Sequence, residues 1–199
     1  MKTLFDWDEV TSLIQLLRSQ GVLYLIGEDA SLGGENETIE PVQLIQRVAS
    51  CGYPLVENAA ISLFILHPEI ASAVTSALQL SEPDLAERIA VLTLATLYLQ
   101  QWWFFRLTFA LGRLPNFPAA PFASLWEERH LPSPDSGYGL DGLLALQMNL
   151  QQQYGLPLNF LDDWQNQIMH LLQQEEARHR LLPEDLRQTL VWQFLPVVY

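Results

Sequence analysis

The chain has 199 residues, 49% of them hydrophobic and 17% charged, which suits one folded domain with at most a small appendage and excludes a disordered or collagen-like chain. Its net charge of −13 argues against a nucleic-acid partner, because ten basic residues are scattered among 23 acidic ones. The single cysteine, Cys51, excludes an intrachain disulfide, and the acidic N-terminus does not resemble a signal peptide, so we expect a cytoplasmic protein.

The first 40 residues predict a helix, a short strand and an acidic loop. Asp6 and Glu9 form a capping-box pattern before an amphipathic run that ends at Gly21. The apolar stretch 22–26 predicts one short buried strand. The loop that follows, residues 27–40, contains five carboxylates and no basic residue.

Four helices are expected next, because prolines mark their first turns and glycines or prolines mark their ends. Their expected spans are 41–51, 54–66, 68–80 and 83–111. Ser81 is the expected capping residue of the fourth helix. This helix is expected to run without a break through Trp102 and Trp103 and to stop at Gly112.

The rest of the chain predicts a proline-rich connector with a short helix, residues 113–139, followed by three helices. Their expected spans are 140–154, 160–182 and 184–194. We therefore predict a mainly α, single-domain helical bundle. Its segments are residues 1–40, 41–112, 113–139 and 140–199.

Residues 89–111 are long enough to cross a membrane, but their composition favours a buried core helix. Gln100, Gln101 and Arg106 lie inside the segment, where polar and charged groups are costly in lipid. The aromatic residues cluster within it, whereas membrane spans carry them as belts at both ends. A helix that is apolar on nearly all sides is typical of the centre of an all-α domain, so we expect no membrane span.

Residues 41–80 resemble HEAT-type helical-repeat proteins. The stretch Pro54–Glu69 is similar to the second helix of such a repeat, with its leading proline and the small pair Ala59 and Ala60, although Glu57 stands where HEAT repeats commonly carry arginine. The resemblance implies a pair of closely packed helices. The chain as a whole also resembles small uncharacterised bacterial helical proteins, which implies no activity.

Two E-x-x-H patterns, Glu127/His130 and Glu176/His179, have the spacing that di-iron helix bundles of the ferritin type use. Both lie in charged runs at expected helix ends, so solvent-exposed helix ends are the favoured interpretation. Whether the two pairs converge on a metal stays open. The same helix-end interpretation applies to His67 and Glu69, which flank Pro68.

The stretch Val22–Gly34, after an amphipathic helix, resembles the opening of small nucleotidyltransferases. In those enzymes a strand ends in a Gly-Ser turn and a carboxylate pair holds metal and nucleotide. Here Gly27 and Ser31 are separated, and Glu35 and Glu37 would have to replace that pair. The resemblance implies at most a degenerate enzyme.

No complete catalytic set is apparent, so the leading hypothesis is a non-enzymatic protein that associates with itself or with a basic protein. No cofactor or metal is expected. The alternatives are a nucleotidyltransferase-like or metal-dependent enzyme, and a small-molecule receptor whose aromatic pocket would be formed by Tyr98, Trp102 and Phe105. The candidate partner-binding residues are acidic residues of the loop and three tryptophans, since tryptophan is enriched in binding hot spots: Glu28, Asp29, Glu35, Glu37, Glu40, Trp126, Trp164 and Trp192.

Overall fold

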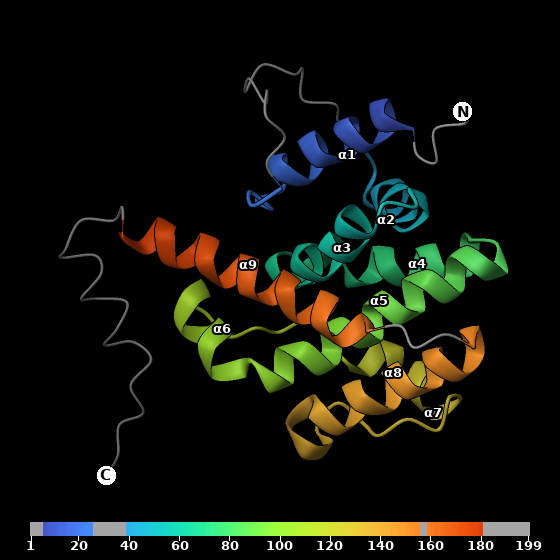
Figure 1. The fold of residues 1–199 in the computed structure, drawn as a ribbon. Coiled ribbons are helices and arrows are strands. Elements are labelled where there is room, and N and C mark those ends of the chain that lie inside the picture. The colour runs from blue at the N-terminus through green and yellow to red at the C-terminus, as the bar shows by residue number, and fades with distance from the viewer. Residues whose placement is uncertain (1–5, 26–38, 156–158, 181–199) are drawn as a thin grey trace, which may run out of the picture.

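The computed structural model describes residues 6–25, 39–155 and 159–180, and these ranges are mainly helical (Figure 1). The α-helices are α1 (Trp7–Ser19), α2 (Pro41–Ser50), α3 (Pro54–Leu66), α4 (Ala71–Leu80), α5 (Pro83–Trp102), α6 (Phe104–Leu111), α7 (Ala123–Glu127), α8 (Leu140–Tyr154) and α9 (Phe160–Arg180). Three short 3₁₀ turns are η1 (Pro68–Ile70), η2 (Ala120–Phe122) and η3 (Ser136–Gly139). The predicted helix at 184–194 lies outside the described residues.

Helix α1 begins at the predicted cap, since the Asp6 carboxylate accepts hydrogen bonds from the backbone N–H groups of Asp8 and Glu9. The strand predicted for residues 22–26 does not form in the part that the structure describes, because residues 22–25 make a turn. The N–H groups of Leu23 and Tyr24 donate to the side chain of Gln174, where a strand would donate to another strand. The sequence prediction was therefore wrong about the backbone here, although Val22 and Leu25 are buried as expected.

The long fourth helix is broken. Helix α5 ends at Trp102, Trp103 leaves the helical conformation, and α6 continues to Leu111 before Gly112, which is left-handed with φ 63°. The N-cap of α5 is Glu82 rather than Ser81. The Ser81 hydroxyl instead accepts a hydrogen bond from the Gln46 side chain at 3.0 Å, which connects the start of α5 to α2.

Helix α5 forms the centre of the core, as expected for residues 89–111 (Figure 1). Its stretch from Leu92 to Gln100 is entirely buried. The Gln100 side-chain amide, a group that is costly to place in lipid, is hydrogen-bonded through both its nitrogen and its oxygen: it donates to the Phe117 carbonyl at 2.7 Å and accepts from the Phe117 N–H at 3.1 Å. This pair of bonds holds the proline-rich connector against α5.

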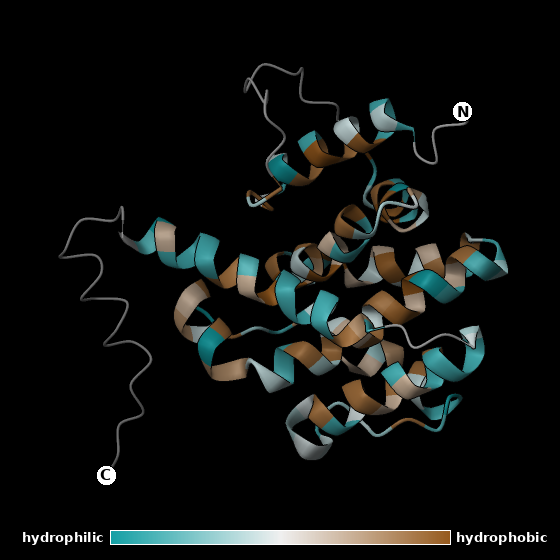
Figure 2. Cartoon of the chain, in the orientation of Figure 1, coloured by the Kyte–Doolittle hydropathy of each residue, from teal (hydrophilic) through white to brown (hydrophobic). Residues whose placement is uncertain are grey.

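Helix α9 lies across the helices around α5 and contacts α3, α6 and α8 (Figure 1). Figure 2 shows mainly hydrophilic residues along its outward side, whereas the helices beneath it are richer in apolar residues. Trp164, Ile168, Leu171 and Leu172 form its buried side, so α9 closes the core by an amphipathic pattern.

No single helix in the described residues is both long and apolar enough to cross a membrane. The segments Pro54–Leu66 and Pro68–Leu80 reach that length and hydropathy only when they are taken together, and they are bent by 104° where they meet.

Helices α5 and α8 approach each other closely at Gly142. An added Cβ at this position would lie 2.1 Å from the Cε1 atom of Tyr98, well inside van der Waals contact. Tyr98 is itself fully buried, and its hydroxyl donates to the Pro132 carbonyl at 2.7 Å. Only glycine therefore fits at position 142 while the Tyr98 ring keeps its place.

We expect Gly142→Ala to destabilise the protein by about 1–3 kcal/mol, because overpacking of the core outweighs the gain of about 1 kcal/mol that Gly→Ala usually gives inside a helix. Urea unfolding followed by circular dichroism measures the change. The matched control is Leu144→Ala on the exposed side of the same helix, where Leu144 is 44% exposed and we expect a change within about 0.5 kcal/mol. A stabilised Gly142→Ala variant would contradict the close packing.

Candidate functional site

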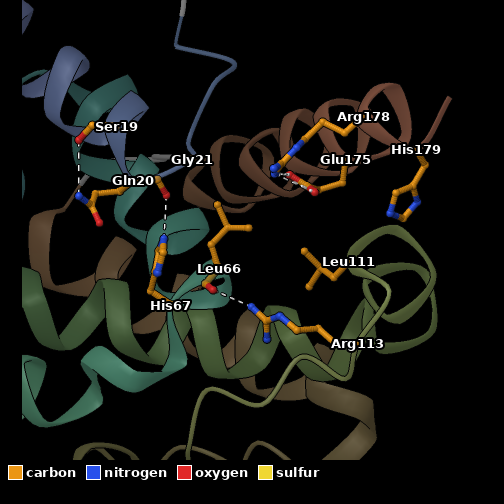
Figure 3. Close-up of a pocket in the computed structure, with 10 residues that line it drawn as sticks. All are labelled: Ser19, Gln20, Gly21, Leu66, His67, Leu111, Arg113, Glu175, Arg178 and His179. Carbon is orange, nitrogen blue, oxygen red and sulfur yellow. Dashed lines mark hydrogen bonds and ion pairs between the residues drawn. The ribbon is translucent and has the colours of Figure 1, made fainter. Parts of the chain in front are cut away.

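A groove of about 790 Å³ lies where the C-terminal ends of α1, α3, α6 and α9 meet (Figure 3). We call it the main groove. Its lining comes from four segments that are far apart in the sequence: Ser19, Gln20, Gly21, Leu66, His67, Leu111, Arg113, Glu175, Arg178 and His179. Leu66 and Leu111 form apolar parts of this lining, and charged side chains surround them.

The meeting of helix ends sets the electrostatics of the main groove. The last carbonyl groups of a helix lack partners within the helix and carry partial negative charge. His67 bonds one of them, with its Nε2 atom 2.7 Å from the Gln20 carbonyl after α1. Its Nδ1 atom lies 2.9 Å from Glu69.

Arg113 satisfies the end of α3. Its Nη2 atom donates to the carbonyls of Ile65 and Leu66 at 3.1 and 2.6 Å, and its Nη1 atom donates to Asn116 at 3.3 Å. This side chain thus joins α3 to the residues after α6. It also brings a positive charge to the wall of the main groove.

Helix α9 supplies the opposite wall. Glu175 is 6% exposed and accepts from Arg178 at 3.1 Å and from the Gln174 amide at 2.7 Å. The same Gln174 amide donates to the Gly21 carbonyl at 2.7 Å. Gln174 therefore fixes the turn after α1 against α9, next to the main groove.

A second groove of about 390 Å³ adjoins the first at His179. We call it the side groove, and it is lined by Arg106, Phe109, Ala110, Glu176 and His179. The Arg106 guanidinium lies 5.2 Å from the Trp103 ring centroid and 3.8 Å from Glu176. Next to it, Phe105 and Phe109 are 75% and 54% exposed. They are four residues apart and therefore share one face of α6, which we call the α6 patch.

The two grooves carry a charge opposite to that of the whole chain. Three arginines, Arg106, Arg113 and Arg178, face two glutamates, Glu175 and Glu176, in their lining. The lining is therefore positive, although the chain has a net charge of −13.

The charged side chains of the lining have partners within the chain. Within the ranges the structure describes, no group of three or more His, Cys, Asp and Glu side chains is placed to hold a metal ion. Of the two E-x-x-H pairs, Glu127 and His130 are exposed at the end of α7, whereas Glu176 and His179 line the side groove. The arginines are already engaged with carbonyls and carboxylates, which makes them structural as well as electrostatic groups.

The structure places the three predicted pocket residues in different environments. Tyr98 is fully buried between α5 and α8, Trp102 is half-buried at the end of α5, and Phe105 is 75% exposed on α6. An aromatic pocket around them gains no support from this placement.

The predicted partner-binding residues are likewise separated. Trp164 is 1% exposed and belongs to the core, so it cannot anchor a partner in this state, whereas Trp126 is half-buried on α7. Glu40 is exposed at the start of α2. Outside the described residues lie Glu28, Asp29, Glu35, Glu37 and Trp192, and with them most of the stretch that resembles nucleotidyltransferases.

Sequence reasoning missed both grooves and the α6 patch. The available signals were Arg113 directly after Gly112 and the run Arg178, His179, Arg180 at the end of a helix. Each suits an ordinary helix C-terminus, and only the tertiary structure brings them to one place.

Two tyrosines are held in their neutral form by the fold. Burial raises the pKa of Tyr98 to about 12. Burial also raises the pKa of the Tyr24 hydroxyl above its ordinary value. The Tyr24 hydroxyl lies 2.7 Å from Gln167 and 2.9 Å from Ser62, which links the turn after α1 to α9 and α3.

We expect Arg113→Met to lower the free energy of unfolding by about 1–3 kcal/mol, because two carbonyls at the end of α3 lose a charged donor. Arg88→Met is the matched control, since Arg88 is 52% exposed and its 3.4 Å pair with Glu57 should contribute at most about 1 kcal/mol. Chemical denaturation measures both. Equal losses in the two variants would mean that Arg113 does not support the groove.

Stability should fall as the pH rises from 10 to 12. In this range the tyrosines of the unfolded chain lose protons, while Tyr24 and Tyr98 in the folded chain keep theirs because their pKa values are raised. The loss is at most about 1.4 kcal/mol per pH unit for each tyrosine. Urea unfolding at pH 10, 11 and 12 tests this, and Tyr24→Phe should flatten the decline, whereas an unchanged slope in that variant would contradict it.

Comparison of the chain with protein-family models, with curated proteins and with solved structures found no match. The arrangement of side chains at the helix ends is therefore the basis on which a function can be argued.

Proposed function

We propose that the chain is a non-enzymatic interaction protein that uses the α6 patch and the adjoining grooves to bind a second copy of itself or another protein. The observation that supports this most directly is the exposure of two phenylalanines, 75% for Phe105 and 54% for Phe109, on one face of a short helix beside a groove. Neighbouring aromatic side chains of this kind are typical anchors at the centre of interfaces.

The charges suit self-association. The grooves present a positive lining, whereas the chain as a whole is strongly acidic, so the acidic surface of one copy complements the groove of another. A basic protein remains the alternative partner, and it would use the acidic surface outside the grooves. Glu40, which is exposed, belongs to that surface.

Two finer proposals accompany this one. We retain the proposal that α2 and α3 form a HEAT-like pair, supported by burial of the small residues Ala59 and Ala60 and by direct contact between the two helices. We also retain a small-molecule receptor as the second candidate function, now at the main groove, because about 790 Å³ falls in the range of ligand pockets. A thermal-shift panel of nucleotides and organic anions tests it, and the absence of any shift would count against it.

We expect Phe109→Glu to weaken association about 30-fold or more, because the loss of an aromatic anchor at an interface typically costs about 2 kcal/mol or more. Sedimentation velocity over a range of protein concentrations measures the dissociation constant for the second copy. The same variant on an affinity column tests a basic partner.

Leu80→Glu is the matched control for this experiment. It introduces the same charge at a side chain that is 73% exposed at the end of α4, away from α6. The control should associate like the unaltered chain. A chain that is monomeric at all concentrations and binds no basic protein, or a Phe109→Glu variant that associates normally, would contradict the proposal.

A further inference from the structure

Tyr138 stands just before α8 in a backbone conformation that suits glycine. Residues 137, 138 and 139 have φ values of 56°, 55° and 81°. Glycine adopts this left-handed region freely and asparagine adopts it readily, whereas the Cβ of a tyrosine is crowded there. Gly139 also packs so closely on α5 that an added Cβ would lie 2.2 Å from the Tyr98 carbonyl oxygen. The turn is thus fixed against α5, and it imposes the left-handed conformation on position 138.

Contacts within the chain do not explain why a tyrosine occupies this position. Tyr138 is 81% exposed, and among the described residues its side chain makes no hydrogen bond or ring contact. The other described non-glycine residue with a positive φ, His130, has a local role, because its N–H donates to the Glu127 carbonyl where α7 ends. Strained residues without such a role are typical of functional surfaces.

The surroundings of Tyr138 in the sequence are acidic. Asp135 and Asp141, one on each side of it, are both exposed. No Lys or Arg occurs in the sequence between Arg129 and Arg178. The turn therefore presents an aromatic ring together with carboxylates and without a basic neighbour in the sequence.

The side groove contains the groups that bind such a ring. Its volume of about 390 Å³ falls in the range of pockets that hold small organic groups. Phe109 and Arg106 in its lining offer an aromatic ring and a guanidinium, both of which pack favourably with a phenol ring. His179 offers ring nitrogens to a phenol hydroxyl. The arginines of the two grooves also complement the carboxylates of the turn.

Tyr138 does not fill the side groove of its own chain. Figure 1 shows that α8 begins at the bottom of the molecule, whereas α9, which supplies one wall of the groove, ends at the upper left. The close packing of Gly139 on Tyr98 holds the turn in its place. A tyrosine that enters the groove from such a turn therefore comes from a second copy.

We infer that Tyr138 of one copy binds in the side groove of a second copy and packs there against Phe109. This inference rests on the proposed function, because it names the residue that occupies the same surface. Each copy then has two different binding surfaces, the turn and the groove. Contacts between unlike surfaces build rings or open chains, depending on the rotation between copies.

Sedimentation velocity of substituted chains tests the role of the tyrosine. Tyr138→Asn should weaken self-association about 30-fold or more, because it removes an aromatic anchor. Tyr154→Asn is the matched control, since it makes the same change at a tyrosine that is 50% exposed at the end of α8. The control should associate like the unaltered chain. Normal association of Tyr138→Asn would overturn the inference.

A mixture of two variants tests whether the turn and the groove bind each other. Tyr138→Asn keeps an intact groove, and Phe109→Glu keeps an intact turn. Neither variant should associate alone at a concentration at which the unaltered chain does. Mixed in equal amounts, they should form a complex of one copy of each, which native mass spectrometry identifies by its mass. Without this mixed complex the inference is overturned, since like surfaces would then pair.

Thermal unfolding tests the strain at position 138. At a concentration at which the unaltered chain is monomeric, Tyr138→Asn should raise the melting temperature by about 2–4 °C, because asparagine tolerates the left-handed conformation better. A gain in stability together with a loss of association is the result that a purely structural tyrosine would not give. A lower melting temperature would mean that the ring stabilises the fold itself, which would overturn the inference.

The same measurements distinguish failure of this inference from failure of the proposed function. If Phe109→Glu weakens self-association and Tyr138→Asn does not, the interaction function stands and the role of Tyr138 is refuted. If the unaltered chain stays monomeric but binds a basic protein, the second copy is excluded as the occupant of the groove. A chain that binds neither a second copy nor a basic protein refutes both.

Discussion

The main groove depends on how the carbonyl ends of the helices are satisfied. Helices α1 and α3 direct their last carbonyl groups into the same region, and such groups are costly to bury without donors. His67, Arg113 and Gln174 supply these donors from other segments of the chain. Two of these side chains, His67 and Arg113, also line the groove, and Arg113 contributes to its charge.

Because arginine side chains that stabilise helix ends also line the groove, an acidic protein can have a positively charged groove lining. Only ten of 199 residues are Lys or Arg. Three of them, Arg106, Arg113 and Arg178, line the two grooves. Arg113 and Arg178 lie at the C-terminal ends of α6 and α9, where positive charge complements the helix dipoles. The net charge does not reveal this local arrangement, so the composition alone suggested a basic partner and gave no sign of the arginines that gather in the groove lining.

The sequence predicted helix boundaries well wherever proline and glycine determine them. The starts at Pro41 and Pro54 and the end at Gly112 follow from local backbone constraints, and the structure confirms them. The break at Trp103 was not predictable in this way, because it has no proline or glycine to mark it. The strand prediction at 22–26 failed in its described part because the N–H groups of Leu23 and Tyr24 donate to the side chain of Gln174, about 150 residues away in the sequence. The sequence did not predict the grooves for the same reason, since they form only where segments far apart in the sequence meet.

The contact between Gly142 and Tyr98 has a consequence for how this architecture can change over evolutionary time. Because a Cβ at position 142 would lie 2.1 Å from the tyrosine ring, position 142 cannot gain a side chain while Tyr98 is retained unless α8 moves away from α5. A larger residue at 142 requires a smaller one at 98, and the smaller residue in turn gives up the hydroxyl that bonds Pro132. Descendants of this fold should therefore carry the two positions as a correlated pair, which makes the pair a sequence signature by which distant kin can be recognised.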